Sequence, residues 1–143
     1  MRATRAVAYE LPARLVVSRE MSVPLSVELG YDAGDPYAVR AVFRTVGSVG
    51  GAGVVEWFFG RDMLTRALRG HAGHGDVRMW SGDGLGRDVL YIALSPPAGS
   101  VLLEIPVEGV ESFLGQTLQM VPPGSESGRL DLDAELERLL ADD

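Results

Sequence analysis

Cysteine and lysine are both absent from the 143 residues. Without cysteine, the chain forms no disulfides, no thiolate metal site and no cysteine nucleophile. Without lysine, a phosphate-binding loop of the Walker type is excluded. No apolar run approaches the roughly 20 residues of a membrane-spanning helix, and no apolar block follows the N-terminal arginines as in a signal peptide. We therefore expect a cytoplasmic globular protein without direct membrane insertion.

Positive charge is scarce toward the C-terminus. The formal net charge is −7, with +2 in residues 1–20, −1 in residues 21–103 and −8 in residues 104–143. An acidic protein repels polyphosphate at long range, so we expect no nucleic acid as a partner unless a local basic patch overcomes that field. The acidic C-terminal region is suited instead to a basic surface on another protein.

Alternation and helical spacing divide most of the chain into strands and helices. Apolar and polar residues alternate in the manner of half-buried strands, or form short apolar runs, at residues 14–20, 23–29, 37–43, 54–59, 76–80, 87–94 and 100–107. Helical spacing appears at residues 62–68 and, most clearly, at residues 110–121. Strands followed by a helix thus occur twice, which predicts an α+β domain of mostly antiparallel strands.

A third, C-terminal helix is predicted after residues Pro122-Pro123-Gly124. Its apolar stripe consists of Leu132, Leu136, Leu139 and Leu140, with acidic residues at its start. That stripe is too narrow for an independent helix, so we expect it to dock on its own domain or on a neighbour. The predicted organisation is one domain over residues 1–143, in which residues 122–143 form an acidic C-terminal extension with a docked helix.

Candidate chemical motifs are weak. His71 and His74 are predicted to lie in a solvent-exposed glycine loop rather than in a metal site. The glycines at positions 82, 84 and 86 predict a hairpin turn, because no helix follows as in a phosphate cradle. No nucleophile carries an activating motif. We therefore predict no catalytic, cofactor-binding or metal-binding residues, and a protein that is not an enzyme.

The tryptophans and three strand arginines have two interpretations. Core packing is the first expectation for Trp57 and Trp80, which lie in apolar strands. Arg40, Arg44 and Arg78 are expected on exposed sheet faces, where arginine usually pairs with neighbouring acids. The alternative is that they contact the phosphates of a single-stranded nucleic acid.

An ordered set of short motifs resembles one known family across nearly the whole chain. The motifs are Asp35-Pro36-Tyr37-Ala38-Val39, Glu56-Trp57-x-Phe59, Arg61-Asp62-x-Leu64, Gly75-Asp76-Val77-Arg78-x-Trp80, Leu94-Ser95-Pro96, Leu102-Leu103-Glu104, Phe113-Leu114, Val121-Pro122-Pro123-Gly124 with Glu126, and Leu130-Asp131-Leu132-Asp133-x-Glu135-Leu136. Together they resemble the SsgA-like family of sporulation and cell-division proteins of filamentous actinobacteria, and within it the SsgB type.

The resemblance carries expectations of fold and function. It implies a non-enzymatic role in septum formation, without cofactors, in which the protein helps to recruit or position the tubulin-like division protein FtsZ at septa. It also implies a Whirly-like fold of two antiparallel β-sheets, each followed by a helix, and a homotrimer. Other division proteins of the same family are further expected partners.

The acidic extension is the hypothetical partner-binding region. Its predicted residues are Gly124, Glu126, Asp131, Asp133 and Glu135. Alternatively, the apolar faces of the last two helices build the oligomer and the sheet faces meet the partners. Three function classes remain: a division scaffold, a Whirly-like single-stranded nucleic-acid-binding protein, and a small hydrolase with a polar pocket around His71 or His74.

Overall fold

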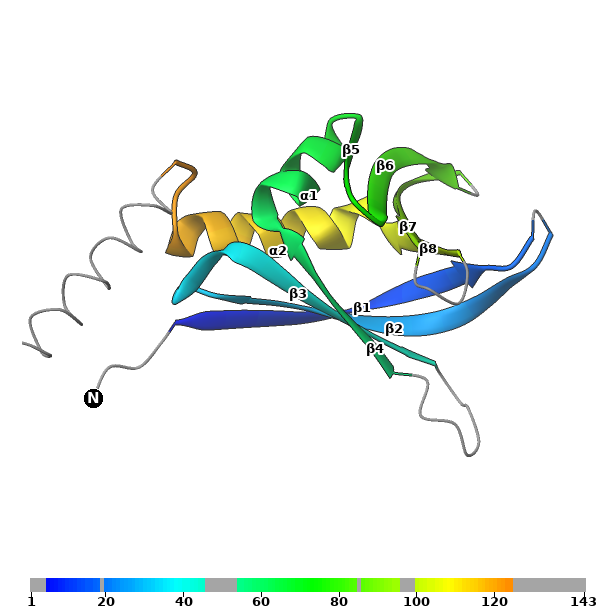
Figure 1. The fold of residues 1–143 in the computed structure, drawn as a ribbon, viewed down its shortest axis with the longest axis horizontal. Coiled ribbons are helices and arrows are strands. Elements are labelled where there is room, and N and C mark those ends of the chain that lie inside the picture. Colours follow the sequence, from blue (N-terminus) through cyan, green and yellow to red (C-terminus); the bar gives the residue numbers. More distant parts are fainter. Residues whose placement is uncertain (1–4, 19, 46–53, 85, 96–99, 125–143) are drawn as a thin grey trace, which may run out of the picture.

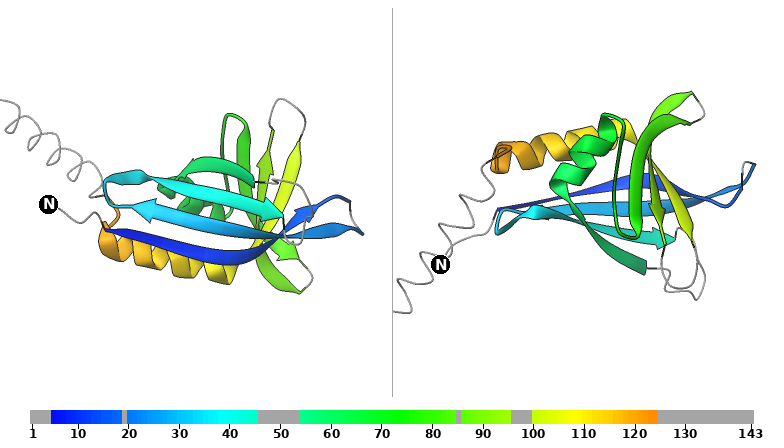
Figure 2. Two further views of the ribbon diagram at one scale, coloured as in Figure 1. Left: turned by 90° about the horizontal axis from the view of Figure 1, so that it is seen from below. Right: turned by 45° about the horizontal axis from the view of Figure 1, so that its top comes forward.

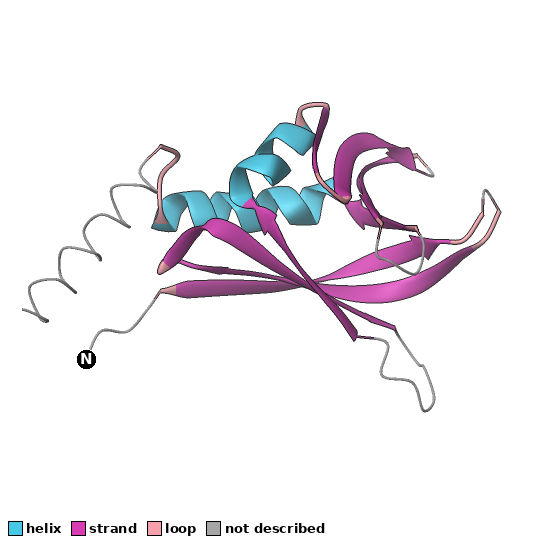
Figure 3. Ribbon diagram, viewed as in Figure 1, coloured by secondary structure: helices cyan, strands magenta, loops and turns pink. Residues whose placement is uncertain are grey.

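The computed structural model describes residues 5–18, 20–45, 54–84, 86–95 and 100–124. Ten elements follow one another in these ranges, with helices and strands distinguished in Figure 3. They are β1 (Ala6–Val16), β2 (Ser22–Asp32), β3 (Asp35–Thr45), β4 (Val54–Gly60), α1 (Arg61–Leu68), β5 (His71–His74), β6 (Val77–Gly84), β7 (Arg87–Leu94), β8 (Val101–Pro106) and α2 (Val107–Met120).

The described strands form one continuous antiparallel sheet. Its strand order is β4-β3-β2-β1-β8-β7-β6-β5, so hairpin connections build each half of the sheet. The halves meet where β1 pairs with β8, at Arg14 opposite Glu104 and Leu15 opposite Leu103. The sheet curls into a half-barrel, and both helices lie on its concave side (Figures 1 and 2). Helix α1 connects β4, at one sheet edge, to β5 at the other.

This topology corrects the predicted fold class. Strands followed by a helix occur twice in the described residues, as the sequence pattern predicted, but the second set has four strands where three were predicted. The predicted Whirly-like arrangement of two antiparallel sheets, each followed by a helix, is wrong, because the β1–β8 pairing joins both sets of strands into one sheet. The predicted C-terminal helix lies outside the described residues.

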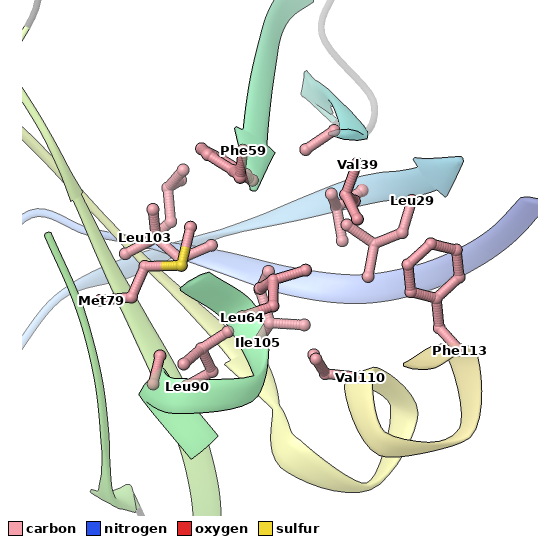
Figure 4. Close-up of a cluster of buried hydrophobic side chains, with 14 of the residues drawn as sticks. Leu29, Val39, Phe59, Leu64, Met79, Leu90, Leu103, Ile105, Val110 and Phe113 are labelled. Carbon is pink, nitrogen blue, oxygen red and sulfur yellow. The ribbon is translucent and has the colours of Figure 1, made fainter. Parts of the chain in front are cut away.

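The core fills the concave side of the curled sheet. Alternation places Val27, Leu29 and Val39 of the first half inside, and the second half supplies Met79, Leu90 and Ile105. Leu64 of α1, with Val110 and Phe113 of α2, lies between them, as Figure 4 shows. Both halves therefore bury their apolar faces against the same two helices.

The convex side of the sheet carries the alternate residues of each strand. Here Arg40 of β3 forms ion pairs with Glu56 of β4 and with Glu28 of β2, the latter at 3.9 Å between Nη1 and Oε1. The expectation that strand arginines pair with neighbouring acids is thus confirmed for Arg40. Phe58, in the edge strand β4, is 59% exposed on the same side. None of the described helices has the length and hydropathy needed to span a bilayer.

Candidate functional site

The C-terminal end of α2 is the point from which the predicted partner-binding region departs. The last carbonyl groups of a helix have no partners within the helix and must find donors elsewhere. Arg61, only 3% exposed, supplies an additional donor at this end of α2. Its Nη1 donates hydrogen bonds to the carbonyl oxygens of Thr117, at 3.0 Å, and Val121, at 2.7 Å. A positive charge at this position also complements the negative end of the helix dipole.

Arg61 reaches this position because β4 passes directly into α1. It is the first residue of α1, and its guanidinium carbon lies 5.0 Å from the ring centroid of Tyr31 in β2. The Tyr31 hydroxyl in turn donates a hydrogen bond of 2.9 Å to the carbonyl oxygen of Pro36. A cation facing an aromatic ring away from water is held more strongly than one in solvent. Arg61 therefore links the first sheet half, α1 and the end of α2.

Asp62 does not share in this arrangement. The Asp62 carboxylate forms an ion pair of 3.2 Å with Arg66, one turn further along α1. Its position in the first helical turn also suits the positive end of the helix dipole.

The backbone beyond α2 turns in a direction that Gly124 permits. Val121 is already extended, with φ −135°, while its N–H still donates to the Thr117 carbonyl oxygen. Gly124 has φ +85°, and a Cβ atom built there would meet no heavy atom within 4 Å. The position therefore favours glycine for its backbone conformation and not for lack of space. The other predicted partner-binding residues, Glu126, Asp131, Asp133 and Glu135, lie outside the described residues.

The two histidines lie on a strand that the sequence did not predict. His71 and His74 are the first and last residues of β5, which pairs with β6, so the expected solvent loop is wrong. Within the described ranges, no group of three or more histidine or acidic residues gathers to hold a metal ion. Of the three glycines predicted to form a hairpin turn, Gly82 and Gly84 lie in strand β6, paired with Val89 and Arg87 of β7, and only Gly86, at φ +80°, lies in the turn between β6 and β7.

The two tryptophans have different environments. Trp57 is partly buried against the core, as expected. Trp80 is not in the core cluster, so the expectation of core packing is wrong for this residue. It lies opposite Tyr91 in the β6–β7 pair, and the two rings stack with centroids 5.5 Å apart and planes 25° apart. Sequence reasoning missed this pair because the strand register that brings the two positions together has no local signal.

Solved structures of sporulation-specific cell-division proteins share this fold. One comes from work entitled "Mutations in SsgB correlate to longitudinal cell division during sporulation of Streptomyces coelicolor"; it has a TM-score of 0.83 and 45% identity, covering 90% of this chain and 98% of that one. A second is the SsgA-like sporulation-specific cell division protein from Thermobifida fusca, with a TM-score of 0.85 and 34% identity over 96% of this chain and 98% of that one.

Sequence comparison gives the same result. Residues 25–126 match the family described as Streptomyces sporulation and cell division protein, SsgA. The sporulation-specific cell division protein SsgB of Streptomyces coelicolor is 48% identical over 95% of this chain and 96% of its own length. The SsgB protein of Frankia casuarinae is 42% identical over 92% and 89%. The chain belongs to the SsgA family, the two relatives compared by sequence are SsgB proteins, and its role lies in sporulation-specific cell division.

Proposed function

We propose that this protein is a non-enzymatic scaffold of sporulation-specific cell division that helps to recruit or position FtsZ at septa. The observation that carries the proposal is the match of residues 25–126 to a family of sporulation and cell-division proteins. In this proposal the protein works with other division proteins of its family, and as a homotrimer.

The proposed contact region begins where the chain leaves α2. Arg61 fixes the last turn of the helix, and Gly124 sets the direction in which the chain continues. The acidic residues Glu126, Asp131, Asp133 and Glu135 follow in a part of the sequence with a net charge of −8 from residue 104 onward. Such a segment suits a basic partner surface, because opposite charges speed encounter and favour correct orientation.

Co-sedimentation with GTP-assembled FtsZ from the same organism tests the proposal. The protein at near-physiological salt should pellet saturably with the polymer and stay in solution without it. Sedimentation velocity of the protein alone would establish its oligomeric state. If a folded, oligomeric protein fails to pellet, direct recruitment is wrong. In that case, salt-sensitive binding of a single-stranded oligonucleotide would favour the nucleic-acid alternative.

Two sets of variants then locate the contact. Charge reversal of the acidic residues within 126–137 should weaken pelleting, and more strongly at low salt than at high salt. Replacement of Gly124 by valine should also weaken it, because a β-branched residue is strained at positive φ.

A matched control separates this effect from general destabilisation. Gly86 has φ +80°, also with open space at its Cβ position, and lies in the β6–β7 turn. Gly86→Val therefore carries a similar backbone strain away from the end of α2. We expect each variant to lose about 1–3 kcal/mol of stability, and only Gly124→Val to lose FtsZ pelleting. Equal pelleting by the two variants would contradict the proposed contact region.

A further inference from the structure

A groove crosses the convex face of the sheet at the end away from the C-terminus of α2. Its volume is about 540 Å³, and it lies between the β1–β2 turn and strands β6, β7 and β8. We call it the aromatic groove; the lining residues used here are Arg14, Met21, Trp80, Asp83, Tyr91 and Glu104. Met21, in the β1–β2 turn, is 59% exposed at its margin. Figures 1 and 2 show that this turn and the β6–β7 hairpin lie at the same end of the molecule.

Strand register builds the groove. Trp80 lies opposite Tyr91, Tyr91 opposite Glu104, and Glu104 opposite Arg14, so one row across four strands has its side chains on the same face. Two glycines of β6 give these side chains room. A Cβ atom at Gly82 would lie 2.9 Å from the Tyr91 ring, and one at Gly84 would lie 3.1 Å from the Glu104 carboxylate.

The row leaves a carboxylate without a cation. Arg14 lies opposite Glu104 but donates its hydrogen bond to Ser22, at 2.8 Å. In the described part of the chain, neither hydrogen bond nor ion pair reaches the half-buried Glu104 carboxylate. Among the described residues, Glu20 and Asp83 also line the groove, so its described lining has three carboxylates and one guanidinium. Their influence extends to Tyr91, whose pKa is raised by burial and then by the charges of Glu104 and Asp83.

We infer that the aromatic groove binds a basic peptide segment of a partner protein, with an arginine side chain over the Trp80–Tyr91 stack and its guanidinium paired with Glu104. Arginine suits both the aromatic stack and the carboxylate of the groove. Its planar guanidinium stacks on aromatic rings and donates two parallel hydrogen bonds to a carboxylate. Cation–π attraction to tryptophan adds to the pairing. A nucleic-acid strand would instead bring its phosphates against the three carboxylates.

This inference rests on the proposed function, since it gives the chemistry of a partner that a scaffold would bind at a second surface. Its test contains no FtsZ, so the two proposals can fail separately. The chain has two tryptophans, and Trp57→Phe leaves Trp80 as the single tryptophan of the full-length protein. Trp80 fluorescence then reports directly on the aromatic groove.

The probe is a capped five-residue peptide of sequence Gly-Arg-Leu-Arg-Gly, with a control peptide that carries neutral citrulline in place of both arginines. We expect the arginine peptide to change Trp80 emission saturably, with a dissociation constant on the order of 1 mM, as suits so small a ligand. The citrulline peptide should bind at least about tenfold more weakly, because it lacks the charge-assisted bonds. A single-stranded oligonucleotide should leave the emission unchanged.

Two further variants test the residues of the groove. Glu104→Gln should weaken the arginine peptide about tenfold, whereas Glu28→Gln should leave its affinity unchanged. Glu28 is a matched control, because it lies on the same convex face but pairs with Arg40 outside the groove. Gly82→Ala should also weaken binding, since its methyl group displaces the Tyr91 ring. Circular dichroism of each variant checks that it is folded.

Three results would overturn the inference. One is equal affinity for the arginine and citrulline peptides. Another is an arginine-peptide signal that Glu104→Gln does not weaken in a folded protein. The third is an oligonucleotide that changes Trp80 emission more strongly than the peptide does, which would assign the aromatic groove to nucleic acid.

Discussion

Arg61 shows how much of the C-terminal geometry depends on one side chain. The guanidinium is buried, faces the Tyr31 ring and donates to two carbonyl oxygens of α2. Buried charges are costly unless hydrogen bonds replace their hydration, and here the carbonyl oxygens of Thr117 and Val121 at the end of α2 accept those bonds. The motif that contains Arg61 was visible in the sequence, but its partners, more than fifty positions away, were not.

Replacing Arg61 should destabilise the protein more than replacing an exposed arginine. Arg61→Met leaves the carbonyls of Thr117 and Val121 without this donor, and we expect the free energy of unfolding to fall by about 2–4 kcal/mol. Arg61→Lys should recover only part of that loss, because an ammonium lacks the planar fork. Urea unfolding gives the values. Arg44→Met, at an exposed position of β3, should change the free energy by less than about 0.5 kcal/mol.

Tyr91 links the stability of the protein to alkaline pH. Burial, and then the nearby carboxylates of Glu104 and Asp83, raise the pKa of its hydroxyl above the ordinary value of 10.0. The folded protein thus holds this proton more tightly than the unfolded chain does. The resulting stabilisation is fully present below pH 10 and is lost as the pH rises through the native pKa.

The measurement is thermal unfolding between pH 8 and pH 11. This interval extends from about two pH units below the usual tyrosine pKa to about one unit above it. Tyr91→Phe should show a smaller loss of stability across that interval than the parent protein. Tyr37→Phe, at a side chain that is 47% exposed, should retain the parent slope. Identical slopes in all three proteins would show that Tyr91 ionisation is not coupled to folding.

Among the elements, those with complete periodicity were predicted well. The spacing of Val110, Phe113, Leu114 and Thr117 predicted α2, and all four are buried. Alternation likewise identified β2 and β3, whose inner residues lie in the core. Strand β5 was missed because its four residues, His71–His74, include a glycine and have no apolar alternation. Its strand structure depends on pairing with β6, which propensity does not indicate.

Helix α2 gives the largest predicted effect of a single substitution. Phe113 is fully buried, and its ring meets that of Tyr9 edge to face with centroids 5.9 Å apart. Phe113→Ala should lower the free energy of unfolding by about 3–5 kcal/mol, because it removes a large apolar side chain and leaves a cavity. Gln116→Ala, on the exposed face of the same helix, should change it by less than about 0.5 kcal/mol. Chemical denaturation of both variants makes the comparison.

At the scale of the whole molecule, the sequence predicted the order of the described elements apart from β5, but not the sheet that they form. Two sets of strands, each followed by a helix, are equally compatible with two sheets or with one. The choice depends on the β1–β8 pairing, in which Arg14 lies opposite Glu104 and Leu15 lies opposite Leu103. That contact joins distant parts of the chain and has no turn or spacing signal. For the same reason, the sequence could not predict which residues come together in the aromatic groove.

The single sheet predicts cooperative unfolding. Helix α1 packs on β3 and β4 in one half and on β5 and β6 in the other, while α2 packs on β1, β7 and β8. Neither half can lose its structure without exposing the core of the other. Trp57 reports on the first half and Trp80 on the second, so the single-tryptophan variants Trp80→Phe and Trp57→Phe separate the two.

In each single-tryptophan variant, urea transitions followed by fluorescence and by far-ultraviolet circular dichroism should coincide within experimental error, as a two-state transition requires. Each variant serves as its own reference, so any change in stability from the tryptophan substitution cancels. A fluorescence transition that precedes the dichroism transition in one variant, but not in the other, would show that the halves unfold separately.

The position of β1 in the middle of the sheet, between β2 and β8, has a consequence for biosynthesis. Among the described strands, the ribosome makes β1 first and β8 last, so one edge of β1 stays unpaired in the nascent chain until β8 has been made. Unpaired backbone of this kind recruits other chains, and closing so distant a contact is slow. The half-barrel can therefore be completed only after nearly all of the described chain has left the exit tunnel. We therefore expect the yield of folded protein to depend on how closely nascent chains lie on the polysome and on the amount of chaperone available.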